Sequence, residues 1–262
     1  MKIQFSKFHG TGNDFIIVDN RDGLLNLESV VIARLCDRHL GIGADGVIIV
    51  EPSVKGDVLM HYYNADGNEA GMCGNGGRCV AAWSLRNGLT DKNINVLAQD
   101  GKHSARIEDT RGGLYIVDLG MTNVDKVKKF EDGFFVDTGV PHFVKPVDDP
   151  ELIDVIKEGR RLRFDERFIP GGVNVNFARI LAGKIWVRTY ERGVEDETLS
   201  CGTGVTATAI AGMLSIGSEI NEWEIHTRGG LLKVFANFKT QVFRDVVLKG
   251  PAQFVFEGEI IL

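Results

Sequence analysis

Two cysteines in this chain stand in matching surroundings that suit acid–base chemistry. Cys73 lies in EAGMCGNGGRC (residues 69–79) and Cys201 in ETLSCGTG (residues 197–204), so both stretches fit the pattern E-x-x-x-C-G-x-G. An apolar run of the kind that forms a helix follows each of them, AAWSL in the first case and VTATAIAGML in the second. Glycines let backbone N–H groups approach a ligand closely, and a helix N-terminus stabilises a thiolate. The pattern therefore predicts two reactive thiols, each at the start of a helix.

Other landmarks recur at nearly the same spacing as the two cysteines, which are 128 residues apart. The recurring pairs are Thr11-Gly12 with Thr138-Gly139, Tyr63-Asn64 with Tyr190-Glu191, and Asp100-Gly101 with Gly229-Gly230. Landmarks in one order with nearly constant spacing indicate an internal duplication. We expect two similar lobes related by a pseudo-twofold axis, with the cysteines facing one another across a cleft.

Composition and charge narrow the class of protein. The chain has 262 residues, of which 44% are hydrophobic, which is enough for two domains with real cores. A formal charge of −6 argues against a nucleic acid or an anionic membrane as the partner and favours a small molecule. The N-terminal sequence MKIQFSKFHGTGND has no signal-peptide pattern, and four scattered cysteines make no disulfide framework. These features predict a cytoplasmic protein with free thiols.

Short strand-like segments separated by turns dominate both halves. Helical spacing is confined to residues 28–39 and 150–163 and to the runs after Cys73 and Cys201. Segments such as residues 14–20, 93–99 and 184–192 read as strands, and the chain finishes in strand-like segments that include FRDVVLKG and FVFEGEIIL. We predict an α+β fold of two lobes, residues 1–120 and 121–251, each with a mixed or antiparallel sheet around a central helix.

Two thiols on opposite walls of a cleft could remove a proton from one face of a carbon and return one to the other. One sulfur would act as thiolate base and the other as thiol acid, and the helix N-termini would bind the substrate carboxylate. Other chemistries fit the residues less well. A redox pair would favour C-x-x-C, a zinc site would need closely spaced ligands, and a Cys–His hydrolase would leave the second motif unused. A thiol switch or an amino-acid-binding protein without catalytic activity stays open.

Further candidates come from the repeated landmarks and from the remaining cysteines. His142 and Glu191 occupy recurring positions and could set the protonation of the thiols. Asn13 could be presented to a ligand by the loop HGTGN, although a plain hairpin turn would look the same. Cys36 and Cys79 fall inside predicted helices and are expected to be structural.

The motifs taken together resemble the diaminopimelate epimerase family. They are FHGTGNDF, GIGADG, YNADGNEAGMCGNGGRC, TGVPHF, GGVNVNF and YERGVEDETLSCGTG, in this order over nearly the whole chain. The resemblance implies interconversion of LL- and meso-2,6-diaminopimelate without pyridoxal phosphate or any other cofactor, in the route to lysine and peptidoglycan precursors. It also implies that the tail, about residues 252–262, packs back on the first lobe, and that the protein could form a homodimer.

The resemblance also assigns roles to residues. Cys73 and Cys201 would be the acid–base thiols, Cys73 acting on the LL substrate, with His142 and Glu191 assisting. The distal, non-reacting end of the substrate would be held by Asn13, Asn64, Asn174, Glu191 and Arg192. The backbone at Gly74-Asn75 and Gly202-Thr203 would hold the reacting carboxylate.

Three departures from the family pattern concern substrate contacts. Val140 stands where many members have Asn, Gly46 stands where some have Gln, and the segment from Glu191 to Cys201 is one residue longer than is common. A proline or hydroxyproline racemase is the alternative on the same scaffold. Arg192 and its Asn partners argue against that alternative, because those substrates lack a second amino-acid end.

Overall fold

The computed structural model describes residues 2–217 and 220–261. The chain divides into two compact units: unit 1 comprises Met1–Leu119 and Gly250–Leu262, and unit 2 comprises Gly120–Lys249. Unit 1 is thus built from both ends of the chain. Unit 2 is one continuous segment.

Unit 1 consists of a mixed sheet and two helices. Its elements are β1 (Lys2–Gly10), β2 (Asn13–Asp19), α1 (Ser29–Cys36), β3 (Gly46–Pro52), β4 (Val58–Asn64), β5 (Glu69–Ala70), α2 (Gly74–Arg86), β6 (Asn93–Ala98), β7 (Gly101–Arg111), β8 (Leu114–Gly120) and the second part of β17 (Val242–Ile261). Helix α2 packs on β1, β6 and β7.

Unit 2 has the same kinds of element around helix α4. Its elements are β9 (Val127–Phe130), β10 (Gly133–Asp137), β11 (Pro141–Pro146), the short 3-10 helix η1 (Pro150–Leu152), α3 (Val155–Arg163), the 3-10 helix η2 (Glu166–Phe168), β12 (Asn174–Leu181), β13 (Lys184–Glu191), β14 (Asp196–Thr198), α4 (Gly202–Ile216), β15 (Glu222–Thr227), β16 (Gly230–Lys239) and the first part of β17. Helix α4 is buried almost all round, and it packs on β12 and β13.

Strand pairing follows one scheme in both units. In unit 1, β1–β2 is antiparallel, β2–β3 parallel, β3–β4 antiparallel, β4–β6 parallel and β6–β7 antiparallel. Unit 2 has the same succession of antiparallel and parallel pairings along its strands β10, β11, β12, β13, β15 and β16. The turns also agree, since Gly12 and Gly139 have φ of 85° and 91°, a region that favours glycine. The predicted α+β fold of two similar lobes with mixed sheets around a central helix is confirmed.

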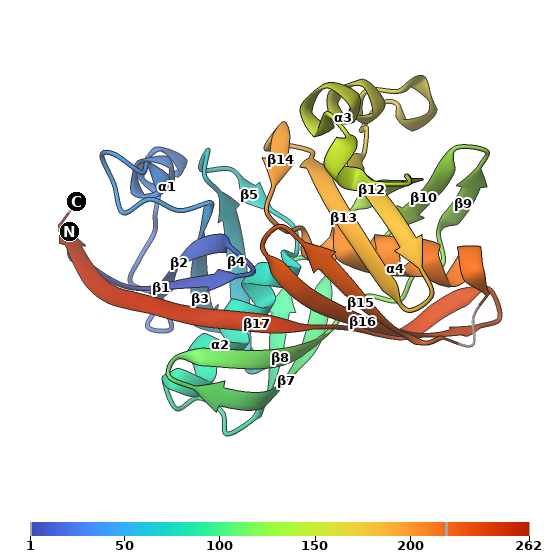
Figure 1. Ribbon diagram of the computed structural model, residues 1–262. Coiled ribbons are helices and arrows are strands. Elements are labelled where there is room, and N and C mark those ends of the chain that lie inside the picture. The colour runs from blue at the N-terminus through green and yellow to red at the C-terminus, as the bar shows by residue number, and fades with distance from the viewer. Residues whose placement is uncertain (1, 218–219, 262) are drawn as a thin grey trace. The chain divides into compact units, whose positions relative to one another are not determined.

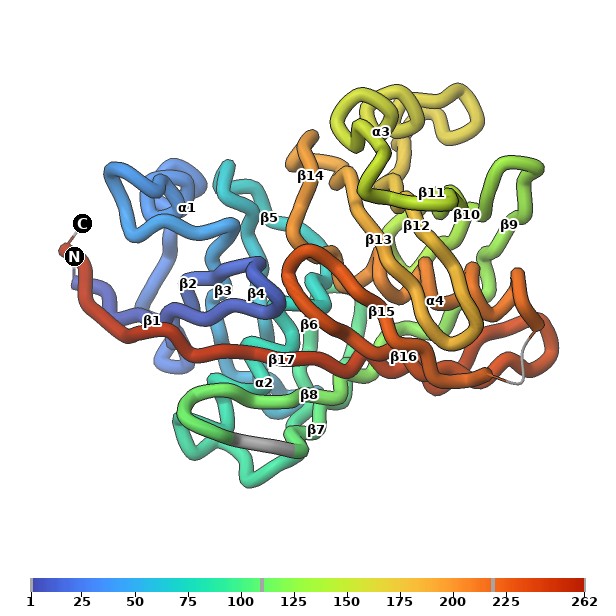
Figure 2. The backbone as a smooth tube through the Cα atoms, in the orientation of Figure 1, coloured from blue at the N-terminus to red at the C-terminus, as the bar shows by residue number. Residues whose placement is uncertain are grey.

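Strand β17 takes part in the sheets of both units. Its residues up to Lys249 pair with β16, whereas Gly250–Gln253 pair with β8 and the residues onward to Ile261 pair with β1. In Figures 1 and 2 its red end runs beside blue β1, and the two ends of the described chain lie together. In unit 2 the segment after β8 pairs with the first strand of the pairing scheme, as the end of β17 does in unit 1. Its strand β9 pairs with β10, and Val124 bridges to Phe243.

Three elements differ from the sequence expectation. The helix expected at residues 28–39 ends at Cys36, because the Asp37 carboxylate accepts the N–H groups of His39 and Leu40 and turns the chain. The helix expected at residues 150–163 is divided, and α3 begins only after Asp154, whose side chain accepts the Lys157 N–H. The two C-terminal strands are one strand, β17, whose pairing partners change near Pro251.

Buried side chains form separate cores in the two units. Ile16, Val18, Ile32, Val47 and Ile49 belong to a core of unit 1 between α1 and the sheet. Unit 2 has a larger core in which α4 packs against its strands, with Trp223 wholly buried. Within the described residues, no helix has the length and apolarity needed to cross a membrane.

Candidate active site

Cys73 and Cys201 take the same backbone position at the starts of α2 and α4. Each is the N-cap residue, with φ −110° and ψ 113° at Cys73 and φ −118° and ψ 113° at Cys201. The carbonyl of each cysteine accepts the first helical bond at 2.8 Å, from Gly77 in one unit and Val205 in the other. The thiols therefore lie where the free N–H groups of a helix favour negative charge.

In unit 1, hydrogen bonds join Cys73 to two predicted binding residues. The Asn13 side-chain oxygen lies 3.7 Å from the Cys73 sulfur and accepts from Asn75 Nδ2 at 3.1 Å. Asn13 Nδ2 donates in turn to the Asp45 carboxylate at 2.9 Å. The sulfur also accepts from the Gly76 N–H at 3.4 Å, within the first turn of α2. Asn13, Cys73 and Asn75 are thus brought together.

Arg78 lies beneath this group and is wholly buried. Its guanidinium donates to Asn75 Oδ1 at 2.8 Å, to the Gly74 carbonyl at 3.2 Å and to the Pro251 carbonyl at 3.4 Å. Burial lowers the pKa of Arg78 to about 10, so the side chain still carries its charge at neutral pH. Arg78 was not among the predicted site residues, although it lies within the cysteine motif GNGGRC.

Asn64 and Gly46 lie opposite one another on β4 and β3. Asn64 Oδ1 accepts a hydrogen bond from the Tyr62 hydroxyl at 2.9 Å. A Cβ added at Gly46 would lie 2.6 Å from the Tyr62 ring and 2.4 Å from the Tyr63 carbonyl oxygen. A residue larger than glycine at position 46 would therefore meet both the Tyr62 ring and the backbone of β4.

In unit 2, the Cys201 thiol is almost completely buried and lies 3.4 Å from Thr203 Oγ1. His142 on β11 and Cys201 both lie close to Gly204 in the first turn of α4. The position that a Cβ would take at Gly204 lies 3.3 Å from His142 Cε1 and 3.4 Å from Cys201 Cβ. The imidazole and the cysteine thus both border the space beside this glycine.

His142 is wholly buried, and its Nε2 has no hydrogen-bond partner within the described part of the chain. Its Nδ1 lies 3.2 Å from the Asn176 side-chain nitrogen. Burial, reinforced by the positive charge of Arg192, lowers the pKa of His142 to about 3. A buried unpaired polar nitrogen costs about 1–3 kcal/mol, a cost that is typical of functional sites. The ring is therefore neutral and has one nitrogen available for a ligand or a neighbouring thiol.

Three more predicted residues lie at the ends of β12 and β13. The Asn174 side-chain oxygen accepts the Arg192 N–H at 2.8 Å, and its Nδ2 donates to the Pro141 carbonyl at 3.3 Å. Glu191 accepts a hydrogen bond from the Thr198 hydroxyl at 2.8 Å. The pairing of His142 with Asn174 across β11 and β12 places these groups next to the imidazole.

The remaining cysteines lie in the core of unit 1. Cys36 is 4% exposed and Cys79 is 0% exposed. Burial raises the pKa of Cys36 to about 11 and that of Cys79 further. Neither thiol is available as a base at neutral pH.

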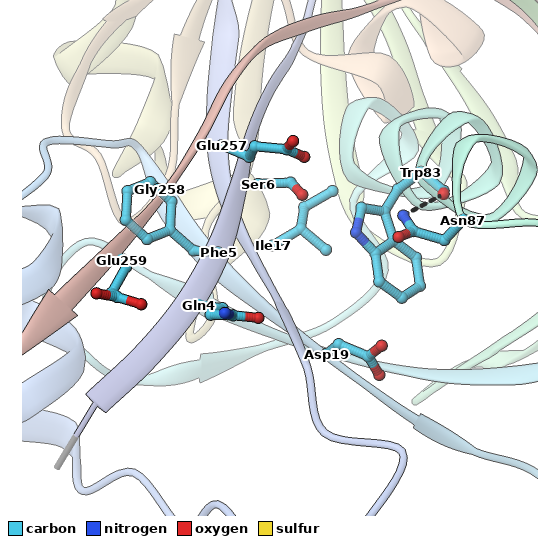
Figure 3. A pocket seen from close by; sticks show the side chains of 10 residues that line it. All are labelled: Gln4, Phe5, Ser6, Ile17, Asp19, Trp83, Asn87, Glu257, Gly258 and Glu259. Carbon is cyan, nitrogen blue, oxygen red and sulfur yellow. Dashed lines mark hydrogen bonds between the residues drawn. The ribbon is translucent and has the colours of Figure 1, made fainter.

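A pocket of about 640 Å³ lies elsewhere in unit 1 and is not the candidate site. The indole of Trp83 and several carboxyl side chains line it, among them Asp19, Glu257 and Glu259 (Figure 3). Arg21 pairs with Asp19 and Lys2 pairs with Glu259, at 2.6 Å in both cases. The residues that line the pocket include none of those predicted for the site.

Comparison with known proteins agrees with these motifs. The family model described as diaminopimelate epimerase matches residues 5–125 and 134–255. The diaminopimelate epimerase of Flavobacterium psychrophilum is 43% identical over 97% of this chain and 98% of its own length. The chain belongs to the diaminopimelate epimerase family. The diaminopimelate epimerase of Archaeoglobus fulgidus is 38% identical over 98% of this chain and 96% of its own. Membership confirms the predicted class of enzyme, an isomerase that epimerises an amino acid.

Solved structures of more distant proteins share the fold. A PhzF-family phenazine biosynthesis protein from Bacillus anthracis has a TM-score of 0.79, with 15% identity and full coverage of both chains. A hydroxyproline epimerase from Agrobacterium vitis has a TM-score of 0.75, with 14% identity over 100% of this chain and 93% of its own. At this level of identity the likeness concerns the fold alone.

Proposed function

We propose that Cys73 and Cys201 are the two acid–base groups with which this enzyme interconverts LL- and meso-2,6-diaminopimelate. The observation that carries the proposal is the matched position of the two thiols, each the N-cap of a central helix with nearly identical backbone angles. Family membership over almost the whole chain supports the substrate and a place in lysine and peptidoglycan precursor synthesis.

The reaction moves protons and needs no change of oxidation state. One thiolate takes the α-proton, and the electrons of the broken C–H bond pass into the adjacent carboxylate. The other thiol gives its proton to the opposite face of the same carbon, so that the configuration inverts. Each turnover leaves the first sulfur protonated and the second ionised, and the reverse reaction restores them.

Backbone N–H groups at the two helix starts would stabilise the charge that gathers on the reacting carboxylate. These groups belong to Gly74 and Asn75 on α2 and to Gly202 and Thr203 on α4. Helix N-termini bind carboxylates well, and fixed donors stabilise a developing anion without reorganisation. We assign the reacting end of the substrate to these four residues.

The distal end of the substrate would be held by Asn13, Asn64, Asn174, Glu191 and Arg192. A guanidinium can bind a carboxylate through two hydrogen bonds, and Asn and Glu oxygens can accept from an ammonium group. Burial and the charge of Arg163 lower the pKa of Arg192 from its usual value, which indicates a partly desolvated cation that would gain from an anionic ligand. This set favours a substrate with a second amino-acid end over proline or hydroxyproline.

His142 and Glu191 would assist the thiols rather than react themselves. The closeness of His142 to Gly204, three residues after Cys201, supports an influence on that thiol. Glu191 would serve both the thiols and the distal ammonium group.

Incubation of the reduced protein with LL-diaminopimelate in deuterated water tests the proposal. Proton NMR of the α-position and chiral separation should show loss of the α-proton signal together with meso product. Cys73→Ser and Cys201→Ser should each abolish net epimerisation, whereas Cys36→Ala, at a core cysteine, should retain it. Wild-type turnover in either serine variant would overturn the two-base mechanism. Exchange with proline or hydroxyproline but not with diaminopimelate would overturn the substrate.

Homodimerisation and a cytoplasmic location stay predictions from the sequence and the family resemblance. Size-exclusion chromatography with light scattering would measure the first, and cell fractionation the second.

A further inference from the structure

Three buried polar side chains form a chain of hydrogen bonds across neighbouring strands of unit 2. His142 lies on β11, Asn176 on β12 and Thr189 on β13, and they are between 0% and 4% exposed. Asn176 Nδ2 lies 3.2 Å from His142 Nδ1, and Asn176 Oδ1 accepts from the Thr189 hydroxyl at 2.9 Å. Asn176 stands directly opposite Thr189 in the antiparallel ladder, so the register itself brings them together.

The partners of Asn176 fix where His142 carries its proton. Asn176 Nδ2 also faces the Phe143 carbonyl at 3.4 Å, and a carbonyl can only accept. The amide nitrogen must therefore lie on the side of Phe143 and His142. Because that nitrogen only donates, His142 Nδ1 must accept, and the proton of the neutral ring is on Nε2.

At the positions equivalent to His142 and Asn176, unit 1 has the apolar residues Phe15 and Ile48. Phe15 pairs with Gly46 as His142 pairs with Asn174, and Ile48 stands opposite Tyr62 as Asn176 stands opposite Thr189. Ile48 lies beneath Gly76 in the first turn of α2, as Asn176 lies beneath Gly204. The fold therefore accepts apolar side chains at these two positions, and the polar layer formed by the pair His142 and Asn176 in unit 2 needs another explanation.

We propose that Asn176 is a positioning residue that holds His142 neutral with its proton on Nε2, so that the ring acts as a hydrogen-bond donor and not as a base. A ring in this state can stabilise a thiolate or a substrate oxygen. It cannot take a proton from a thiol at the nitrogen that is free. The inference rests on the proposed function for its meaning, because acid–base thiols in the site give the donor its purpose.

The test reads the tautomer directly, in the full-length reduced protein labelled with nitrogen-15 in its histidine rings. Long-range proton–nitrogen correlation spectra at neutral pH, with His142→Gln to assign the signals, should show an unprotonated Nδ1 and a protonated Nε2. In Asn176→Asp the new carboxylate accepts a hydrogen bond, so the proton should appear on Nδ1. This variant should also lower kcat for α-proton exchange by about tenfold or more, with a smaller change in KM. Asn221→Asp, at an exposed asparagine of unit 2, is the charge-matched control and should change neither.

Two results would overturn the inference: a proton on Nδ1 in the wild-type protein, or a ring spectrum in folded Asn176→Asp that matches the wild type. The wild-type spectrum needs no variant, so misfolding of Asn176→Asp would not decide the question. The NMR spectra report the tautomer of His142 without any enzymatic turnover, whereas the serine variants at Cys73 and Cys201 test the proposed function. The inference about Asn176 and the proposed function can therefore be refuted independently.

Discussion

A Cβ added at Gly204 would lie 2.5 Å from the side-chain oxygen of Asn176. The amide is wholly buried and bonded on both sides, so it has no room to withdraw. Only a glycine at position 204 allows the first turn of α4 to lie directly on the polar layer that carries His142.

Gly204→Ala is therefore expected to cost about 1–3 kcal/mol of unfolding free energy through overpacking and to lower activity by displacing His142. Gly76→Ala is the matched control in unit 1, where the nearest atom is the flexible end of Ile48 at 3.1 Å. Urea unfolding and epimerase assays on both variants measure the difference. Equal losses in the two variants would show that the polar layer plays no special part.

Arg78→Met should destabilise the protein more than an ordinary substitution of a charged residue. It removes the donor to Asn75, Gly74 and Pro251 in a fully buried place, and leaves their oxygens without this partner. We expect a loss of about 2–4 kcal/mol in the free energy of unfolding, against about 0.5 kcal/mol or less for Arg106→Met at an exposed strand position. Chemical denaturation of the pair checks this, and similar values for the two would refute it.

Asp14 should make stability depend on acid pH. Burial raises its pKa, but hydrogen bonds from Arg38 and Lys7 outweigh this effect and lower the pKa from 3.8 to about 2. A lowered pKa means that the stabilisation is present above the unfolded value and is lost as pH falls toward the folded one. Asp14→Asn should cost about 1–2 kcal/mol at neutral pH, after allowance for solvent screening of a partly buried carboxyl.

The difference between Asp14→Asn and the wild type should shrink as pH falls from 3.8 to about 2. Thermal unfolding across this range measures it, with Asp148→Asn as the control for loss of an exposed charge. A difference that stayed constant across the range would mean that Asp14 is not stabilised as a carboxylate.

Alkylation should distinguish Cys73 from the two core cysteines, Cys36 and Cys79. Burial holds Cys36 and Cys79 as protonated thiols, whereas Cys73 is only half-buried at a helix start. Brief treatment of the native protein with iodoacetamide should modify Cys73 and spare Cys36 and Cys79, as read by peptide mass mapping. Unfolding in guanidinium should expose all four. Labelling of Cys36 at the rate of Cys73 would contradict this assignment.

Much of the fold could be predicted from the sequence because its signals are local. The strand-like segment at residues 14–20 predicted β2, and the glycines after Cys73 and Cys201 marked the starts of α2 and α4. The spacing of the landmarks predicted the repeat, and the strand pairings bear it out.

The polar layer and the buried cation could not be predicted, because they depend on pairing between distant segments. Asn174–Ala178 on β12 is buried throughout, so the sequence has no alternation to show which face Asn176 occupies. Its partners lie on β11 and β13, and only the register identifies them. Arg78 lies on a helix that is buried all round at its start, where helical spacing again gives no face. The end of α1 was misplaced because the turn at Asp37 comes from a side-chain bond and not from a glycine.

The course of β17 has a consequence for how the protein is made. Lys2 pairs with Ile261, so the sheet of unit 1 lacks a strand until residues 250–261 have been synthesised. Until then β1 and β8 each present an open edge, the kind of edge that invites pairing with other chains. Unit 2 is continuous and has its complete sequence before that point. We therefore expect unit 1, whose first strands are synthesised before unit 2, to complete its fold after unit 2.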